Sequence, residues 1–266
     1  MLNRYLSLIS TGLPRETNSL HVASTFNSSH YTKALIQSGA DVNELNDSKD
    51  TPLAIACYWN RADTVNLLLE AGAHPEISNC LGTPLINAVA GPYPDASDRY
   101  KIVEKLLQYK ANIEAEALKF NHRTILGCAI ISNDFKLVKL LLKHKANIEH
   151  QDSDGNTPLM LCKNLKMLKL LLKYKPDLNK VNKKGQTVLY IYTEKCLREM
   201  VSVLLKNNAN PDIADHEQRK PEDLGKFAGN TLRDISYDIR LFKTQTNRQK
   251  RYLERTERKE MKLKTR

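Results

Sequence analysis

Residues Asp154-Gly155-Asn156-Thr157-Pro158-Leu159 combine a turn signal with the start of a helix. The Asp-Gly pair favours a tight turn. Thr157 is suited to cap a helix N-terminus with its hydroxyl, and Pro158 suits the first helical position, where a backbone N–H has no partner. Leu159 then begins an apolar face. The stretch therefore predicts a turn followed by a helix with one buried side.

This element recurs along the chain. Thr51-Pro52-Leu53 and Thr83-Pro84-Leu85 repeat it, and Thr124-Ile125-Leu126 and Thr187-Val188-Leu189 are weaker copies. A second element recurs in step with it and is centred on Ala40, Ala73, Ala111, Ala146, Pro176 and Ala209, at separations of 33, 38, 35, 30 and 33 residues. A regular period of this length indicates a stack of units, each of which buries its apolar face against its neighbours.

The chain resembles the ankyrin-repeat family over roughly residues 17–235, because a Thr-Pro-Leu head and a period near 33 are typical of that family. The resemblance implies an all-α solenoid of about six to seven helix-turn-helix repeats, with β-turn fingers and helical caps. We expect an N-terminal cap at 1–16, the array with its C-terminal capping helix at 17–243, and a basic tail at 244–266 that is a helical extension or disordered.

Three repeats depart from the pattern. The third has six extra residues around 91–98, which form either a binding loop that exposes Tyr93 or a tolerated insertion. The finger from Glu114 to Arg123 is longer by two residues. The fifth repeat lacks three residues near Lys163, where we expect a tighter turn between its helices. Only the first repeat keeps the family's Leu-His pair, and the resemblance implies that His21 ties it to its neighbour.

Composition limits the class of protein. The net charge of +11 is uneven, since residues 240–266 contain eleven Lys or Arg against three Glu. Four of the five cysteines fall in predicted helices and none forms a C-x-x-C pair, which favours free thiols in a reducing, cytoplasmic compartment. No apolar run reaches the roughly 18 residues of a membrane-spanning helix. The run Tyr5–Ile9 lacks the cleavage site of a signal peptide.

The motifs of nucleotide-binding, metalloprotease and serine-hydrolase sites do not occur in the sequence. The seven histidines are dispersed, and Asp152 and Asp154 lie at finger positions where Asp satisfies backbone N–H groups. We therefore predict a protein that is not an enzyme, with no catalytic residues, metal, cofactor or small-molecule substrate.

The family resemblance implies a monomeric scaffold that binds an unknown protein partner through its concave face. The predicted contact residues lie at the ends of the inner helices and at finger tips: Asn46, Ser48, Lys49, Tyr58, Trp59, Tyr93, Ile131 and Lys183. Trp59, the sole tryptophan, is either an exposed interface anchor or packed on the next repeat.

Two further readings stay open. The Lys- and Asn-rich composition is similar to that of ankyrin proteins of intracellular bacteria, which suggests an effector delivered into a host cell, with the tail as translocation signal. The rival function is binding of nucleic acid or an anionic membrane through the basic tail at 244–266.

Overall fold

The computed structural model describes residues 19–26, 28–92, 97–227 and 230–264. The expected N-terminal cap at 1–16 lies outside these ranges. The chain forms two compact units, residues 1–153 and 154–266, which are described separately below. No helix in the described ranges is both long enough and apolar enough to cross a membrane.

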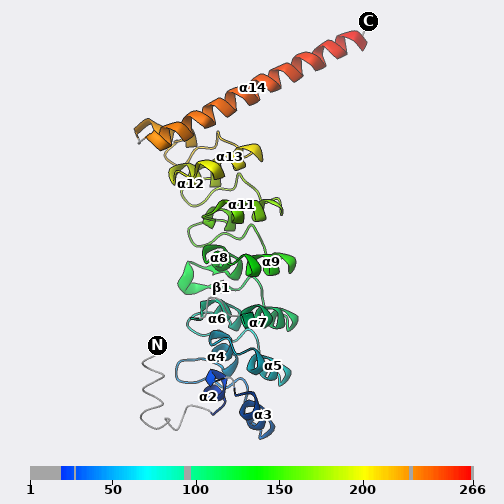
Figure 1. Ribbon diagram of the computed structural model, residues 1–266, viewed down its shortest axis with the longest axis vertical. Helices are drawn as coiled ribbons and strands as arrows, with labels where there is room; N and C mark the ends of the chain where they lie inside the picture. Colours follow the sequence, from blue (N-terminus) through cyan, green and yellow to red (C-terminus); the bar gives the residue numbers. More distant parts are fainter. Residues whose placement is uncertain (1–18, 27, 93–96, 228–229, 265–266) are drawn as a thin grey trace. The chain divides into compact units, whose positions relative to one another are not determined.

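The first unit is a stack of four antiparallel helix pairs (Figure 1). The inner helices α2, α4, α6 and α8 pack on one another, and so do the outer helices α3, α5, α7 and α9. The bounds are α2 (Ser19–Phe26), α3 (Ser29–Gln37), α4 (Pro52–Tyr58), α5 (Ala62–Glu70), α6 (Pro84–Ala90), α7 (Ser97–Gln108), α8 (Ile125–Ile131) and α9 (Phe135–Lys143).

The lengthened finger of this unit folds into a short hairpin. Strand β1 (Glu116–Ala117) pairs antiparallel with β2 (Arg123–Thr124), and the one-turn helix η1 (Leu118–Phe120) joins them. Asn121 and His122 adopt left-handed backbone conformations, with φ of 57° and 52°. Two extra residues are thus absorbed at the tip of a finger, where they leave the helix stack undisturbed.

The second unit continues the pattern and ends in a long helix (Figure 1). Its elements are α10 (Pro158–Leu161), α11 (Leu165–Leu172), α12 (Val188–Glu194), α13 (Arg198–Lys206), the short helix η2 (Pro221–Phe227) and α14 (Asn230–Lys264). Helix α14 packs on η2, α12 and α13 through its first turns. The expected capping helix and the expected helical extension are therefore one continuous helix.

The predicted helix starts are present in most repeats. Pro52, Pro84 and Pro158 each occupy the first turn of a helix. The Thr51 hydroxyl accepts a hydrogen bond from the Ala54 N–H, 3.1 Å away. Thr157 precedes its helix in an extended conformation but forms no side-chain cap, so the predicted capping by its hydroxyl is wrong. The proline and the turn suffice there, because the proline already has a helical φ.

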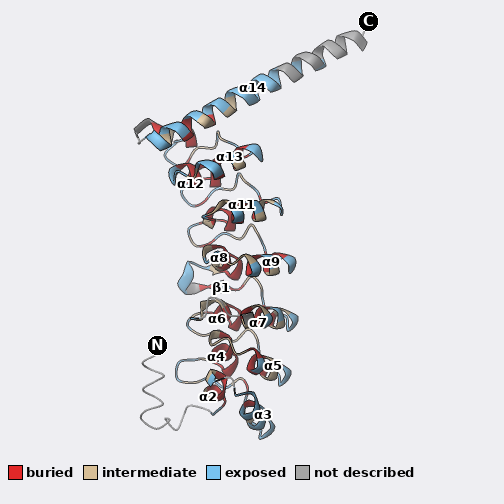
Figure 2. Ribbon diagram, in the orientation of Figure 1, coloured by how far each residue is buried: buried red, intermediate tan, exposed pale blue. Residues whose placement is uncertain are grey.

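Buried leucine, isoleucine, valine and alanine side chains line the surfaces on which the helices of each unit meet (Figure 2). The Leu of each head motif is fully buried, as Leu53 and Leu85 show. His21 is also buried, and its Nε2 lies 3.0 Å from the Asp50 carbonyl oxygen of the next repeat. Because a carbonyl only accepts, Nε2 carries the proton, and burial lowers the pKa of this imidazole. The implied tie between neighbouring repeats is present.

Three of the described fingers are closed by the same side-chain turn. The Asn46 side-chain oxygen accepts from the backbone N–H groups of Ser48 and Asp50 at 2.9 Å. Asn182 and Asp215 make the same pair of bonds two and four residues ahead. The fourth residue of the turn has positive φ, which explains glycine at 155 and 185 and the strained φ of 60° at Lys49.

A second recurring bond joins successive fingers. In the first unit the side chain of Asn43 accepts from the His74 N–H, Glu76 from Asn112, and Glu114 from Asn147, at 2.7–2.8 Å. In the second unit Asn179 accepts from the Asn210 N–H at 2.9 Å. These side-chain bonds fix the spacing of adjacent repeats on the finger side, because each spans about one repeat length of sequence.

The last acceptor of this series is satisfied differently. Asp212 has the position of Asn179 one repeat later, and its carboxylate lies 2.7 Å from the Lys243 ammonium of α14. Lys243 also lies 2.9 Å from Glu222 of η2. Hydrogen bonding to Lys243 lowers the pKa of Asp212. Helix α14 therefore closes the series through an ion pair at Lys243, where a further repeat would have donated a backbone N–H.

The fifth repeat is shortened in its helix and not in the turn that follows. Helix α10 has 4 residues, whereas α4, α8 and α12 have 7. Those three helices are followed by a residue of positive φ, which is Asn60, Asn133 or Cys196. After α10 the chain instead leaves through Cys162 in an extended conformation, and Asn164 caps α11. The prediction of a tighter turn is thus replaced by the loss of one helical turn.

One further expectation needs correction. All five cysteines are free, as predicted, but only Cys57 and Cys128 lie within helices. Cys162 and Cys196 lie just after helices, and Cys80 is in a finger. Burial raises the pKa of the Cys57 thiol, and raises that of Cys128 to about 11. Both are therefore poor nucleophiles at neutral pH.

Candidate partner-binding site

An aromatic cluster lies at the inner-helix ends of the first two repeats. Phe26 ends α2, and Trp59 follows α4 at the equivalent position 33 residues later. Phe26 is 58% exposed, while Tyr58 and Trp59 are half-buried. The Tyr58 and Trp59 rings meet edge to face, with centroids 5.5 Å apart and an angle of 87° between their planes. We call Phe26, Tyr58 and Trp59 the aromatic cluster.

The backbone that carries this cluster is firmly held. The Arg61 Nε donates to the Thr25 carbonyl oxygen at 2.8 Å, which joins the second repeat to the end of α2. The Trp59 N–H donates to the Ile55 carbonyl oxygen at 2.9 Å. On the other side, a side chain at Gly91 would collide with the Tyr58 carbonyl oxygen, so only glycine allows this close approach of the third repeat.

The predicted finger residues differ in how accessible their side chains are to a partner. Ser48 and Lys49 are exposed and available to a partner. Asn46 is half-buried and its side-chain oxygen already accepts two backbone bonds, so it shapes the finger. Leu45, which the sequence interpretation overlooked, is 51% exposed beside it.

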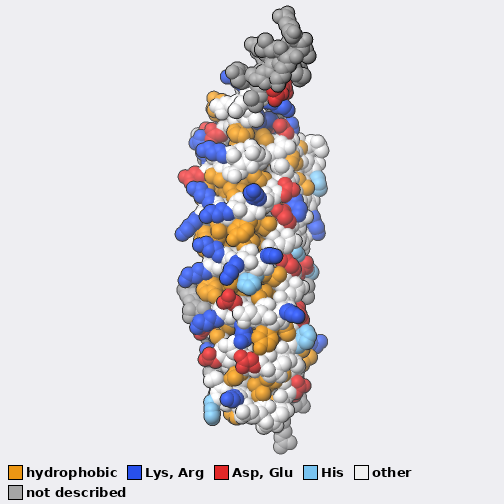
Figure 3. Space-filling model, turned by 90° about the vertical axis from the view of Figure 1, so that its right-hand side faces the viewer, with side chains coloured by type: hydrophobic (Ala, Val, Ile, Leu, Met, Phe, Trp, Pro, Cys, Tyr) orange, Lys and Arg blue, Asp and Glu red, His pale blue; other side chains and the backbone are white. Residues whose placement is uncertain are grey.

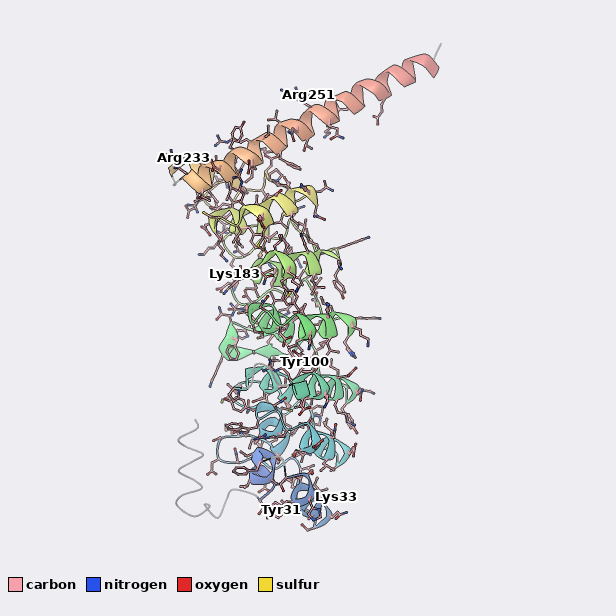
Figure 4. The ribbon with its side chains drawn as sticks, viewed as in Figure 1. Tyr31, Lys33, Tyr100, Lys183, Arg233 and Arg251 are labelled. Atoms are coloured by element: carbon pink, nitrogen blue, oxygen red, sulfur yellow. The ribbon has the colours of Figure 1, made fainter. Side chains whose placement is uncertain are left out.

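The remaining predicted residues are more widely placed. Ile131 ends α8 in the first unit at the position equivalent to Tyr58, and it is half-buried. Lys183 is exposed on a finger of the second unit, and its backbone N–H donates to the Asp154 carbonyl oxygen at 3.0 Å (Figure 4). Tyr93 lies outside the described residues. The candidate site considered below is therefore limited to the first unit and comprises the aromatic cluster and the exposed finger residues Leu45, Ser48 and Lys49.

Sequence reasoning also overlooked Phe26. The signal was available, because Phe26 follows Leu20 by six residues, as Trp59 follows Leu53. Repeat proteins place equivalent positions of successive repeats in register on one face. Two aromatic residues at one register position therefore indicate an aromatic surface that a single repeat does not reveal.

Titratable groups also gather at the hairpin of the first unit. Glu116 of the hairpin lies 3.0 Å from His122 Nδ1 and 3.6 Å from His150 Nε2. Arg123 pairs with the buried Asp152 carboxylate at 3.1 Å. No group of three or more metal-ligating side chains suited to a metal ion is found within the described ranges. These contacts join the hairpin to the following finger.

A stack of helix pairs with finger-like turns and an aromatic surface at the inner-helix ends defines a helical-repeat scaffold. The ankyrin-repeat family model, in three copies, matches residues 5–79, 85–182 and 151–215. The chain therefore belongs to the ankyrin-repeat family, and its all-α fold is confirmed. Ankyrin-repeat domains are in general non-catalytic modules that bind other proteins.

Solved structures support the fold. The ankyrin repeat domain of human ASB11 is similar, with a TM-score of 0.67 and 22% identity, over 84% of this chain and 97% of that one. The ankyrin repeat domain of Bcl-3, described as a unique member of the IkappaB protein family, has a TM-score of 0.70 and 23% identity, over 81% and 96%. No curated protein sequence matches the chain.

Proposed function

We propose that the chain is a monomeric scaffold that binds a partner protein through the aromatic cluster. The observation that carries this proposal is Phe26, a large apolar side chain that is 58% exposed at the position where the next repeat has Trp59. Aromatic anchors surrounded by polar groups are typical of interface centres. Ser48 and Lys49 supply polar groups on the neighbouring finger.

Phe26→Ala in the full chain tests this function, with Tyr31→Ala as its matched control. Tyr31 is 48% exposed on the outer helix α3 of the same repeat (Figure 4). In affinity capture from cell extract, a specific partner should be lost with Phe26→Ala and kept with Tyr31→Ala. Equal capture of the partner by both variants would show that the aromatic cluster is not the binding surface.

A second candidate function is binding of nucleic acid or an anionic membrane through the tail, residues 244–266. It is favoured by the exposed basic side chains of α14, which include Arg248, Lys250 and Arg251 (Figure 4). Neutralising these three in the full chain, as Arg248→Gln, Lys250→Gln and Arg251→Gln, should weaken binding to polyanions and flatten its salt dependence. Unchanged binding would dismiss the tail as the binding element.

The finer assignment to an effector that acts in a host cell belongs to the same proposal. Five free thiols, of which Cys80 and Cys196 are exposed, support a reducing compartment. A reporter fused to residues 244–266 tests whether the tail directs translocation. Transfer of a reporter that lacks residues 244–266 into the host cell would contradict that role.

A further inference from the structure

The outer helix of the fifth repeat carries a row of lysines. Lys166, Lys169 and Lys173 follow one another at intervals of three and four residues on and just after α11, and Lys163 and Lys175 flank them. All five side chains are exposed. Residues 155–176 contain no Asp or Glu. The row therefore presents positive charge on one face of a helix, because intervals of three and four place side chains on the same side.

Two other outer helices, α7 and α13, carry cations that are ion-paired. In α7, Lys101 pairs with Asp98 at 2.8 Å and Lys105 with Glu70 at 3.5 Å. In α13, Arg198 pairs with Asp238 of α14 at 2.8 Å. Apart from Lys166, the lysines of the α11 row take part in no ion pair within the described part of the chain. Their charge is open to an external anion.

The pattern occurs a second time. Helix α9 in the first unit carries an identically spaced row, which is 30 residues earlier in sequence and likewise exposed: Lys136, Lys139, Lys143 and Lys145. Figure 3 looks onto the outer helices and shows Lys and Arg side chains beside hydrophobic patches on this side of the molecule. Recurrence at one register shows that the α11 row is a feature of the outer face and not one isolated lysine.

The two units differ sharply in charge. Residues 154–266 contain 26 Lys or Arg and 14 Asp or Glu, a net charge of +12, whereas residues 1–153 contain 15 and 16, a net charge of −1. The α11 row thus lies in the unit that holds the whole positive excess. Helix α14 of the same unit also runs toward the side on which α11 and α13 lie (Figure 1). Long-range attraction of an anionic surface would therefore reinforce the row.

The side chains around the row fit a lipid surface better than a nucleic acid. The row contains lysines only, which act as point charges and lack the planar fork with which arginine reads phosphates and bases. Tyr174, between Lys173 and Lys175, is 44% exposed, and Leu170 and Leu172 are half-buried. Tyrosine prefers the boundary between headgroups and water, where its ring is apolar and its hydroxyl is solvated.

We propose that the α11 row is a docking surface for anionic lipid bilayers. Clusters of about four to eight basic residues on an amphipathic helix are typical of segments that bind anionic lipids. Helix α11 would lie along the membrane with its lysine side chains toward the headgroups.

Vesicle cosedimentation of the full chain tests this inference, with phosphatidylcholine alone compared with an equal mixture of phosphatidylcholine and phosphatidylserine. Wild type should bind only the mixed vesicles. The triple change Lys166→Gln, Lys169→Gln and Lys173→Gln should weaken that binding by roughly 100-fold, since each lysine near an anionic surface contributes about fivefold. Lys→Arg at the same positions should keep it.

The control variant removes three exposed lysines from the first unit, as Lys33→Gln, Lys110→Gln and Lys119→Gln, and should bind vesicles nearly as wild type does. Wild-type affinity in the α11 variant would overturn the inference. So would binding of wild type to duplex DNA but not to vesicles. If only the Arg248, Lys250 and Arg251 variant loses vesicle binding, the tail is the membrane element and the α11 row is not. The outcome for Phe26→Ala is independent of all these results.

Discussion

Single residues in this chain have roles that their repeat position decides. Trp59 and Phe26 share a position, but Phe26 is 58% exposed whereas Trp59 is half-buried and contacts Tyr58. Tyr58 belongs to the same repeat as Trp59, so this contact is not packing on the next repeat. The choice between an interface anchor and a residue packed on the next repeat therefore stays a prediction.

Trp59→Ala should weaken partner binding by about 2 kcal/mol, as truncation of an interface anchor does. It should reduce the free energy of unfolding by less than the roughly 3–5 kcal/mol expected for a fully buried tryptophan. Thermal melts and binding titrations of the same variant separate the two effects. A loss of stability in that full range, with unchanged binding, would make Trp59 a core residue.

His21 should make stability depend on pH. Its pKa is lowered below the ordinary 6.5 by burial, so the unfolded chain binds a proton more readily than the folded chain does. The stability linked to neutral His21 is therefore present above pH 6.5 and is lost as the pH falls through the lowered value. His21→Gln should cost about 1 kcal/mol at neutral pH and remove this part of the dependence. Denaturant unfolding at several pH values measures both, and an unchanged pH profile in the variant would exclude His21 as the cause.

At the scale of elements, the pairs of helices are similar but not equal. Helix α10 has 4 residues and forms few intrahelical hydrogen bonds, because the first four N–H groups of any helix lack intrahelical acceptors. It also begins the second compact unit. The short helix is offset in part by the Tyr192 hydroxyl, which donates to the Leu159 carbonyl oxygen at 2.6 Å from the next repeat.

The fifth repeat should open more readily than the second. Amide hydrogen exchange is expected to be faster for residues 163–175 than for α4 and α5, because local opening follows local contact density. Tyr192→Phe removes the hydrogen bond to Leu159 and should lower the free energy of unfolding by about 1 kcal/mol. It should also increase the difference in exchange rate between the two repeats. Equal protection of the two repeats would contradict the assignment of a weak joint.

The ion pair at Lys243, which ends the array, should make a modest but measurable contribution to the free energy of unfolding. Lys243→Gln removes the partner of Asp212 and Glu222, and should cost about 0.5–1.5 kcal/mol in urea unfolding. Lys250→Gln, an exposed position on the same helix, is the control and should cost nearly nothing. The pKa of Asp212 is lowered, so the difference between wild type and Lys243→Gln should shrink as the pH falls below 3.8. A difference that persists in acid would show that packing, and not charge, is responsible.

At the scale of the whole molecule, repeats and tail separate in burial as well as in charge. Ile235 and Ile239 of α14 are fully buried, Lys243 is half-buried, and residues 244–251 are exposed. Deletion of Thr244–Arg266 should therefore leave the melting temperature nearly unchanged. Deletion from Leu232 onward, which removes both buried isoleucines, should lower it by many degrees. A large drop from the shorter deletion would place the boundary of the array further along α14.

The sequence by itself determined the repeat, its register and the chemistry of its turns. These depend on neighbouring residues: a turn pair, a proline at a helix start, an acceptor side chain two and four residues before the donors it binds. The residue spacing shows that the fifth repeat is shorter than the others. It does not show that the loss falls in α10, because the missing residues could equally have come from a turn. That Lys243 closes the array through Asp212 appears only in the tertiary structure. This contact depends on segments brought together by stacking, and the geometry of stacking is a property of the packed chain and not of any contiguous stretch.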